Sequence, residues 1–244
     1  MIELISSPMK RILLLCVFFL ISYQANAQFN KTISVALNAV YSTSANIYLS
    51  PNSSDLFLRN NSFLIEHIFN PSIDLRYRLS ESILIGFNTE LMRTTAIGPN
   101  LTVFMNNSTV TINVEDGFEL VPLELSAYYV LPFSTEHIYF LMGGGAGYYL
   151  GSHVRKFGDA EVSNLERKAS YGIHVSLSMD YLIKEYLSIR GEMKFRDPQF
   201  AVKSKYNKQE VNYDGKIIRL VQNSFDSKVN VDGVTFVLGL VFHL

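Results

Sequence analysis

Side chains of opposite chemistry alternate along residues 171–196, and no other feature limits the possible folds of the chain as strongly. The odd-numbered residues are apolar or glycine from 171 to 181 and again from 187 to 195. The even-numbered residues carry the polar groups, among them His174, Asp180, Arg190, Glu192, Lys194 and Arg196. Successive side chains of a β-strand point to opposite faces, so the pattern predicts two long strands joined by a short turn, with one apolar and one charged face.

The N-terminus has the three parts of an export signal. Met9-Lys10-Arg11 is basic, residues 12–21 form an uninterrupted apolar run, and Ala25-Asn26-Ala27 fits a small-x-small cleavage site. The apolar run is too short to cross about 30 Å of hydrocarbon as a helix. We therefore expect a signal peptide over residues 1–27 and a mature chain of residues 28–244, with either Met1 or Met9 as the start.

Composition argues against a nucleic-acid partner. The chain has 21 Lys and Arg residues against 22 Asp and Glu residues, and no basic run that would supply phosphate contacts. Residues 28–244 suffice for one barrel or sandwich, and no Gly-, Ser- or Pro-rich linker divides them. We expect a single exported β domain.

The same alternation recurs along the mature chain and predicts eight strands. They lie at residues 32–41, 72–79, 83–91, 118–131 and 138–150, in the two halves of 171–196, and at 234–244. Connections of about three to six residues alternate with connections of roughly 20 to 35 residues. Transmembrane barrels with short periplasmic turns and long extracellular loops show this rhythm. Residues 42–66, 93–116, 151–170 and 197–232 are accordingly expected to be loops.

The apolar face of these strands carries no charged residue. A charge that faces lipid costs about 2–4 kcal/mol near the bilayer centre. An open sheet edge in hydrocarbon would leave backbone N–H and C=O groups without partners, so a sheet in lipid must close. The predicted fold class is therefore all-β, an eight-stranded antiparallel transmembrane β-barrel whose charged face lines the interior.

Three segments of the chain are similar to segments of a known family. They are residues 139–149 (YFLMGGGAGYY), residues 122–125 (PLEL) and the strand that ends the chain. With them the mature chain resembles the small outer-membrane β-barrel proteins of Gram-negative bacteria, in particular the outer membrane protein beta-barrel domain family common in Bacteroidota. The resemblance implies an outer-membrane location, contact with outer-membrane lipid and insertion by the barrel assembly machinery. Family members usually end in an aromatic residue, whereas this chain ends in Phe242-His243-Leu244.

Catalytic and metal-binding patterns are weak. His174, Ser176 and Asp180 share one face of a predicted strand, but His174 and Asp180 would lie ~20 Å apart at ~3.4 Å per residue, too far for a hydrogen-bonded triad. No H-x-H or H-E-x-x-H spacing occurs, so no metal or cofactor is expected. A site at the extracellular rim would need the fold to group residues now far apart in sequence: His67, Asp116, His153, Asp159 and Glu161.

Charged side chains of both signs are predicted to point into the barrel. The acids are Asp74, Glu90, Glu124, Asp180 and Glu192, and the bases are Arg76, Arg78, Arg190, Lys194 and Arg196. Because an eight-stranded barrel is just wide enough for side chains to fill, we expect interlocking ion pairs extended by Tyr128, Tyr139 and His174. The favoured function is a structural role, or binding of an extracellular ligand or protein through the long loops. The alternatives are a conduit for lipids or small molecules and, with less support, a lipid-modifying or proteolytic enzyme.

Overall fold

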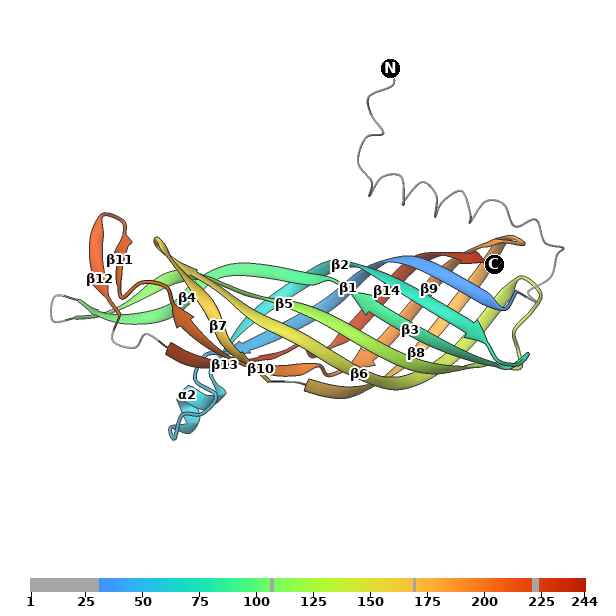
Figure 1. Ribbon diagram of the computed structural model, residues 1–244, viewed down its shortest axis with the longest axis horizontal. Helices are drawn as coiled ribbons and strands as arrows, with labels where there is room; N and C mark the ends of the chain where they lie inside the picture. The colour runs from blue at the N-terminus through green and yellow to red at the C-terminus, as the bar shows by residue number, and fades with distance from the viewer. Residues whose placement is uncertain (1–30, 106–107, 169, 221–223) are drawn as a thin grey trace, which may run out of the picture.

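The alternating segments form antiparallel β-strands that pair edge to edge around a ring (Figure 1). The computed structural model describes residues 31–105, 108–168, 170–220 and 224–244. The expected signal peptide lies outside the described residues. Within them, no helix is long and apolar enough to cross a membrane.

Eight strands close the ring, with each strand pairing with the next and the last pairing with the first. In ring order they are β1 (Ile33–Tyr48), β2 (Ser62–Arg78), β3 (Ile83–Glu90), β5 (Ser108–Val130), β6 (Ile138–Phe157), β8 (Ser170–Lys184), β9 (Leu187–Arg196) and β14 (Val234–His243). The predicted eight-stranded antiparallel barrel is confirmed.

The remaining strands lengthen the wall at one end of the ring. β4 (Met92–Met105), β7 (Ala160–Arg167), β10 (Gln199–Tyr206) and β13 (Ser224–Asn230) continue the wall after short breaks from β3, β8, β9 and β14. A short hairpin of β11 (Glu210–Tyr213) and β12 (Lys216–Arg219) follows β10, and the helix α2 (Leu56–Asn60) lies between β1 and β2. Most of the segments expected to be loops are therefore strands, which corrects the sequence-based strand boundaries.

The two ends of the barrel differ in their connections. The short turns at residues 79–82, 131–137 and 185–186 lie at the same end as residue 31 and the C-terminus, and we call this the turn end (Figure 1). The opposite end, the loop end, carries α2, the β11–β12 hairpin and the added strands β4, β7, β10 and β13. We call the part of the molecule beyond the closed ring the extension.

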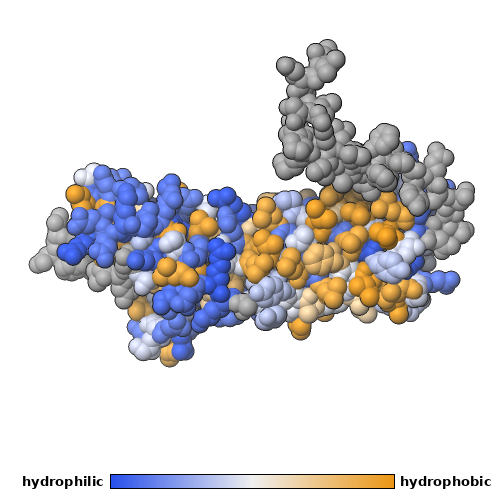
Figure 2. All heavy atoms as spheres, in the orientation of Figure 1, coloured by the Kyte–Doolittle hydropathy of each residue, from blue (hydrophilic) through white to orange (hydrophobic). Residues whose placement is uncertain are grey.

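The outer surface of the ring is apolar. Leu37, Ile173 and Leu238 are 55%, 79% and 64% exposed, whereas His174, which directly follows Ile173, is buried. Figure 2 shows apolar side chains over the half of the molecule that holds the ring and hydrophilic side chains over the extension. The predicted register, with apolar residues outward and polar residues inward, is confirmed for the ring strands.

Backbone pairing is complete in the ring and incomplete in the extension. The ladder between β2 and β3 ends at Ser72 and Glu90, and the ladder between β6 and β8 ends at Tyr149 and Ser170. Beyond these pairs the described residues form two sheets, β4–β5–β6 and β7–β10–β13–β1–β2, which β6 and β7 join again only at their shared tip. Unpaired edges are tolerated in water but not in lipid, so the ends of the two ladders mark the edge of the membrane.

Side-chain chemistry inverts at the same level. On β5, Glu124 and Ser126 point inward in the ring, whereas Phe118 and Leu120 point inward in the extension and are fully buried. Glu119 lies on the outer face between them, in an ion pair with Arg93 of β4. The ring is therefore apolar outside and polar inside, and the extension is the reverse.

Two glycines make room for one large inward side chain. A Cβ atom at Gly143 would lie 2.3 Å from Cδ1 of Tyr128, and one at Gly86 would lie 2.7 Å from its Cε2. Any larger residue at either position would therefore displace the aromatic ring of Tyr128. Gly143 and Gly86 therefore give the Tyr128 side chain its place inside the barrel.

A paired substitution tests where the lipid ends. Leu177→Arg places a charge on the lipid face of β8 and should cost about 2–4 kcal/mol or block assembly. Ile97, on β4 of the extension, is 74% exposed, and Ile97→Arg should leave stability nearly unchanged because the side chain faces water. Unfolding in lipid vesicles, followed by heat-dependent gel migration, measures both effects. Equal losses in the two variants would refute this placement of the membrane.

Candidate functional site

A continuous chain of charged side chains crosses the interior of the ring. Arg190 binds Asp180 through two hydrogen bonds, from Nε to Oδ1 and from Nη2 to Oδ2, each 2.7 Å long. Its Nη1 lies 2.7 Å from Oδ1 of Asp74, which also accepts from Nε of Arg76 at 2.8 Å. Nη2 of Arg76 then lies 2.6 Å from Oε2 of Glu192. In this half of the network, acidic and basic side chains therefore alternate without a gap.

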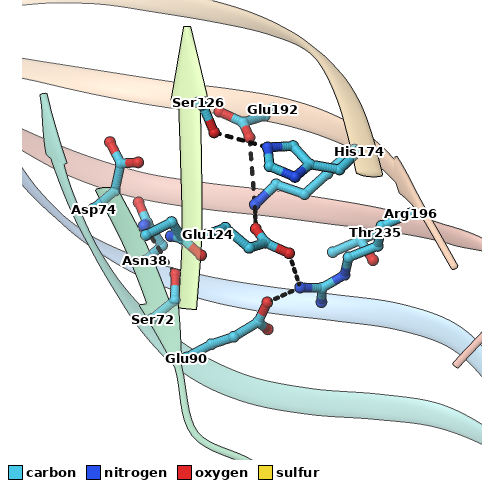
Figure 3. A network of polar contacts seen from close by, with 12 residues as sticks. Asn38, Ser72, Asp74, Glu90, Glu124, Ser126, His174, Glu192, Arg196 and Thr235 are labelled. Atoms are coloured by element: carbon cyan, nitrogen blue, oxygen red, sulfur yellow. Dashed lines mark hydrogen bonds and ion pairs between the residues drawn. The ribbon is translucent and has the colours of Figure 1, made fainter. Parts of the chain in front are cut away.

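The second half continues toward the loop end (Figure 3). Nζ of Lys194 lies 4.0 Å from Oε1 of Glu192 and 2.7 Å from Oε2 of Glu124. Nη1 of Arg196 lies 3.1 Å from Oε1 of Glu124 and also binds Glu90. All of these side chains are buried. Buried ion pairs therefore fill the middle of the barrel, and we call them the ion chain.

The ion chain ties opposite walls together. Arg190, Glu192, Lys194 and Arg196 alternate along β9, which places all four on its inner face. Their partners on β2, β3 and β5 come from the far side of the ring, because β9 and β3 lie four strands apart in either direction. Buried charges are stable only when paired and hydrogen-bonded, so each contact from β9 to β2, β3 or β5 fixes the position of two walls.

Two residues expected in the network have different surroundings. Arg78 lies at the turn end, where its Nη1 donates to the carbonyl of Glu81 at 3.3 Å and its guanidinium stacks 5.8 Å from the Tyr139 ring. His174 lies beside the ion chain and shares a 2.7 Å hydrogen bond with Oγ of Ser126. The ion chain thus joins five carboxylates to four cations, rather than the balanced five and five read from the sequence.

Small cavities adjoin the ion chain. Two of them have volumes of about 10 Å³ and 20 Å³, which is room for about one water molecule each. Arg76 adds a stacking contact, with its guanidinium carbon 3.8 Å from the centre of the Tyr128 ring. The arrangement is a packed polar core and not a lined pore.

An apolar layer covers the ion chain on its loop-end side. It contains Met92, Phe118, Leu120, Tyr149 and Phe200, all buried. Phe200 packs so closely over Gly151 that a Cβ there would lie 2.3 Å from the ring. Sequence reasoning missed this layer because it expected a polar lining along the predicted strands, which include Phe118, Leu120 and Tyr149, and because it assigned Phe200 to a loop. The signal that could have revealed the layer is the alternation of apolar and polar residues, which continues along the predicted strand as far as Leu120.

A second buried polar cluster lies farther along the extension. Nε2 of His153 lies 3.2 Å from Oδ1 of Asp116, and Nε of Arg155 lies 3.6 Å from the same oxygen. Nδ2 of Asn100 donates to the other carboxylate oxygen at 3.0 Å. Phe225 packs edge-on against the His153 ring, with 5.8 Å between the ring centres. Of the residues considered for a rim site, the fold brings together only His153 and Asp116.

The other rim candidates are scattered. His67 stacks with Tyr41 and shares a 2.8 Å hydrogen bond with its hydroxyl group, on the exposed side of the wall. Asp159 lies at the tip, where hydrogen bonds from the Lys208 ammonium group and the Asn212 N–H hold the pKa of its carboxyl group below the usual range. Glu161 pairs with Lys156 at 3.5 Å. The described residues contain no group of three or more metal ligands.

Solved structures with the same architecture identify the fold. Over 89% of this chain and 98% of the other, the structure superposes on the outer membrane protein OprG from Pseudomonas aeruginosa, with a TM-score of 0.59 and 14% sequence identity. This is the fold of a small outer-membrane β-barrel. No family model and no curated protein matches the sequence, so the likeness is one of fold alone.

Two further solved structures share the strand arrangement more distantly. The outer membrane protein AlkL, in lipid bilayers, gives a TM-score of 0.45 and 16% identity over 91% of this chain and 96% of that one. Ail of Yersinia pestis, in complex with a heparin analogue, gives a TM-score of 0.44 and 9% identity over 87% and 97%. The resemblance to small Gram-negative outer-membrane barrels predicted from the sequence is confirmed, whereas the bacterial group stays a prediction.

Removing one cation from the ion chain should destabilise the barrel. Arg190→Ala leaves Asp74 and Asp180 buried without their shared partner, which should lower the free energy of unfolding by about 3–5 kcal/mol. Arg93→Ala breaks the exposed pair with Glu119 and should cost about 0–1 kcal/mol. Thermal unfolding of both variants in the same detergent measures the difference. A stability of Arg190→Ala equal to that of Arg93→Ala would contradict a stabilising role for the ion chain.

Proposed function

We propose that the protein is a closed, non-conducting barrel that anchors a rigid binding platform at the cell surface. One observation carries the proposal: buried ion pairs fill the middle of the ring, and two cavities that adjoin them have volumes of about 10 Å³ and 20 Å³. The apolar layer around Phe118 and Phe200 then blocks the route toward the loop end. A hydrated ion would have to displace several paired charges and packed rings to pass. Residues 28–244 would form the inserted protein after cleavage behind Ala27.

The extension supplies the platform. Its two sheets enclose a second apolar cluster, in which Val211 and Ile218 of the β11–β12 hairpin pack against Phe157 and Tyr206. Burial in this cluster raises the pKa of the Tyr206 hydroxyl group. Because the hairpin is held by packing and not by a flexible tether, the tip presents a fixed surface. A groove of about 280 Å³ lies on this surface between β5 and the hairpin and is the proposed site for an extracellular ligand.

The same proposal assigns each end of the barrel to one side of the outer membrane. With the turn end in the periplasm, the short turns and the C-terminal strand face the assembly machinery, and the loop end faces outward. The apolar extension core then lies outside the membrane, where its polar outer surface is hydrated. His153 and Asp116, the two rim candidates that the fold brings together, are both buried, so the proposal rests on binding at the surface.

A lateral conduit is the second candidate, and one feature of the wall favours it. β2 and β4 have no backbone ladder between them in the described residues beyond Leu91, whose N–H donates to the carbonyl of Pro71 at 3.2 Å. Side chains close this seam, and the Phe63 ring lies 2.4 Å from where a Cβ of Gly98 would be. Opening the seam would connect the apolar layer around Met92 with the lipid.

Electrical recordings separate the two candidates. The purified protein in a planar bilayer should show no steady conductance, because no continuous water path passes the ion chain. Vesicles containing the protein should also take up an apolar fluorescent dye no faster than empty vesicles. A porin reconstituted in parallel verifies the recording. Stable channel openings, or faster dye uptake, would overturn the closed-barrel proposal and support the conduit.

Epitope insertion tests the orientation. Asp214 and Gly215 form the exposed turn of the β11–β12 hairpin, and both have positive φ angles, of 49° and 75°. An epitope inserted between them should bind antibody on intact cells. One inserted after Glu185, in the β8–β9 turn, should bind only after the outer membrane is permeabilised. The reverse pattern of labelling would show that the barrel is inserted the other way round.

A further inference from the structure

Cations gather on the outer face of the larger extension sheet. β7, β10 and β13 and the residue that follows β7 carry three carboxylates: Glu161, which lies next to the tip, Glu166 and Asp226. They carry five exposed or half-exposed cations: Arg167, Lys168, Lys203, Lys205 and Lys228. We call these five residues the basic face. Within the described part of the chain, none of the five forms an ion pair.

The smaller sheet of the extension shows the opposite arrangement. Arg93 of β4 lies 3.3 Å from Glu119 of β5, and Lys156 of β6 lies 3.5 Å from Glu161 of β7, where the two sheets join at the tip. Glu115 is the direct strand partner of Lys156. Arg93 and Lys156 therefore form ion pairs with carboxylates of the protein. On the basic face Lys203 has two carboxylates as strand partners, Glu166 and Asp226, whereas the strand partners of Lys205 and Lys228 are uncharged. Lys205 and Lys228 are thus the cations most available to an external anion.

The basic face begins where the membrane-spanning ring ends. Lys168 is two residues from Ser170, the last residue of the β6–β8 ladder, and Tyr171 beside it is 78% exposed on the lipid side. The N–H of Lys168 donates to the carbonyl of Ala201 at 3.1 Å, and Ala201 pairs with Lys228. Lys203 follows two residues later on the same face of β10. These cations lie within a few residues of the lipid edge, at about 3.4 Å per residue, and so close to the headgroup layer.

An apolar element lies beside the basic face. Nδ2 of Asn52 donates to Oδ2 of Asp226 at 2.9 Å, which fixes the loop that carries α2 to the outside of β13 and occupies this carboxylate. α2 projects sideways from the wall near β13 and not from the far tip (Figure 1). Its residues Leu56, Phe57 and Leu58 are 60%, 79% and 49% exposed. Apolar side chains next to cations are typical of segments that lie in a membrane interface.

We propose that the basic face, together with α2, binds a phosphorylated lipid of the outer leaflet. Its phosphate groups would be held by lysine and arginine, which bind phosphate through charge-assisted hydrogen bonds. Its acyl chains would continue onto the apolar surface of the ring below Tyr171, and α2 would contact the same leaflet from the side. Continuity with the lipid-facing surface favours a lipid over a soluble polyanion.

Neutralising the basic face tests the proposal. The triple variant K203Q/K205Q/K228Q removes three positive charges that lie outside the interior, so folding should be retained. The matched control R93Q/K156Q removes cations from the smaller sheet. Each protein is titrated with phosphatidylcholine nanodiscs or micelles that contain a diphosphorylated glucosamine lipid, or its dephosphorylated form, and bound lipid is counted by native mass spectrometry. At about fivefold per cation near a charged membrane surface, affinity for the phosphorylated lipid should fall on the order of 100-fold in the triple variant and stay unchanged in the control.

Three results complete the test. The charge-preserving variant K203R/K205R/K228R should bind like the wild type, which separates charge from any loss of fold. Equal losses in the triple variant and the control, or equal binding of the phosphorylated and dephosphorylated lipid, would overturn the proposal. The proposal would also be overturned if the triple variant retained binding of the phosphorylated lipid but lost binding of a sulfated polysaccharide. That result would assign the basic face to a soluble polyanion. The outcome is independent of whether the interior conducts.

Discussion

Backbone hydrogen bonding in lipid is the constraint on which the rest of the structure depends. Hydrocarbon offers no partner for an N–H or C=O group, so every strand of the ring must pair on both sides. Pairing stops at Glu90 on β3 and at Tyr149 on β6, and there the wall divides into two sheets and the chemistry of its faces inverts. The strands continue from the ring, which lies in lipid, into the extension, which lies in water, and only the solvent around them changes.

Closure of eight strands makes the interior narrow, and the ion chain is a response to that confinement. Polar residues face inward because the outer face is committed to lipid, yet a narrow barrel leaves too little water to solvate them. Acid and base therefore alternate from Asp180 to Glu90, and β9 supplies most of the cations. The pairs of β9 with Asp74, Arg76, Glu90 and Glu124 span the barrel, so the solution to desolvation also braces opposite walls.

Sequence reasoning predicted the ring well and the extension poorly, for one physical reason. In the ring, alternation with an uncharged apolar face is decisive, so the strands, their register and the inward charges could be predicted. In the extension the alternation persists with its faces exchanged, as at Phe118 and Glu119. The predicted strand included these two residues, but residues 93–116, which continue the wall in β4 and β5, were read as a loop. Partners across the interior, such as Arg190 with Asp74, depend on the stagger of the barrel and have no local signature.

A filled interior also confines the places where such a barrel can act. If nothing passes the ion chain, interactions must occur on the tip or on the outer wall, and the structure separates these two surfaces. The tip has its own apolar core around Val211 and Ile218, which keeps the groove above it in shape without help from the membrane. Among the described residues, the cations of the basic face form no ion pair, whereas Arg93 and Lys156 do. Cations without an ion-pair partner beside the lipid edge attract anionic headgroups, so the outer wall is suited to the lipid and the tip to a ligand from outside the cell.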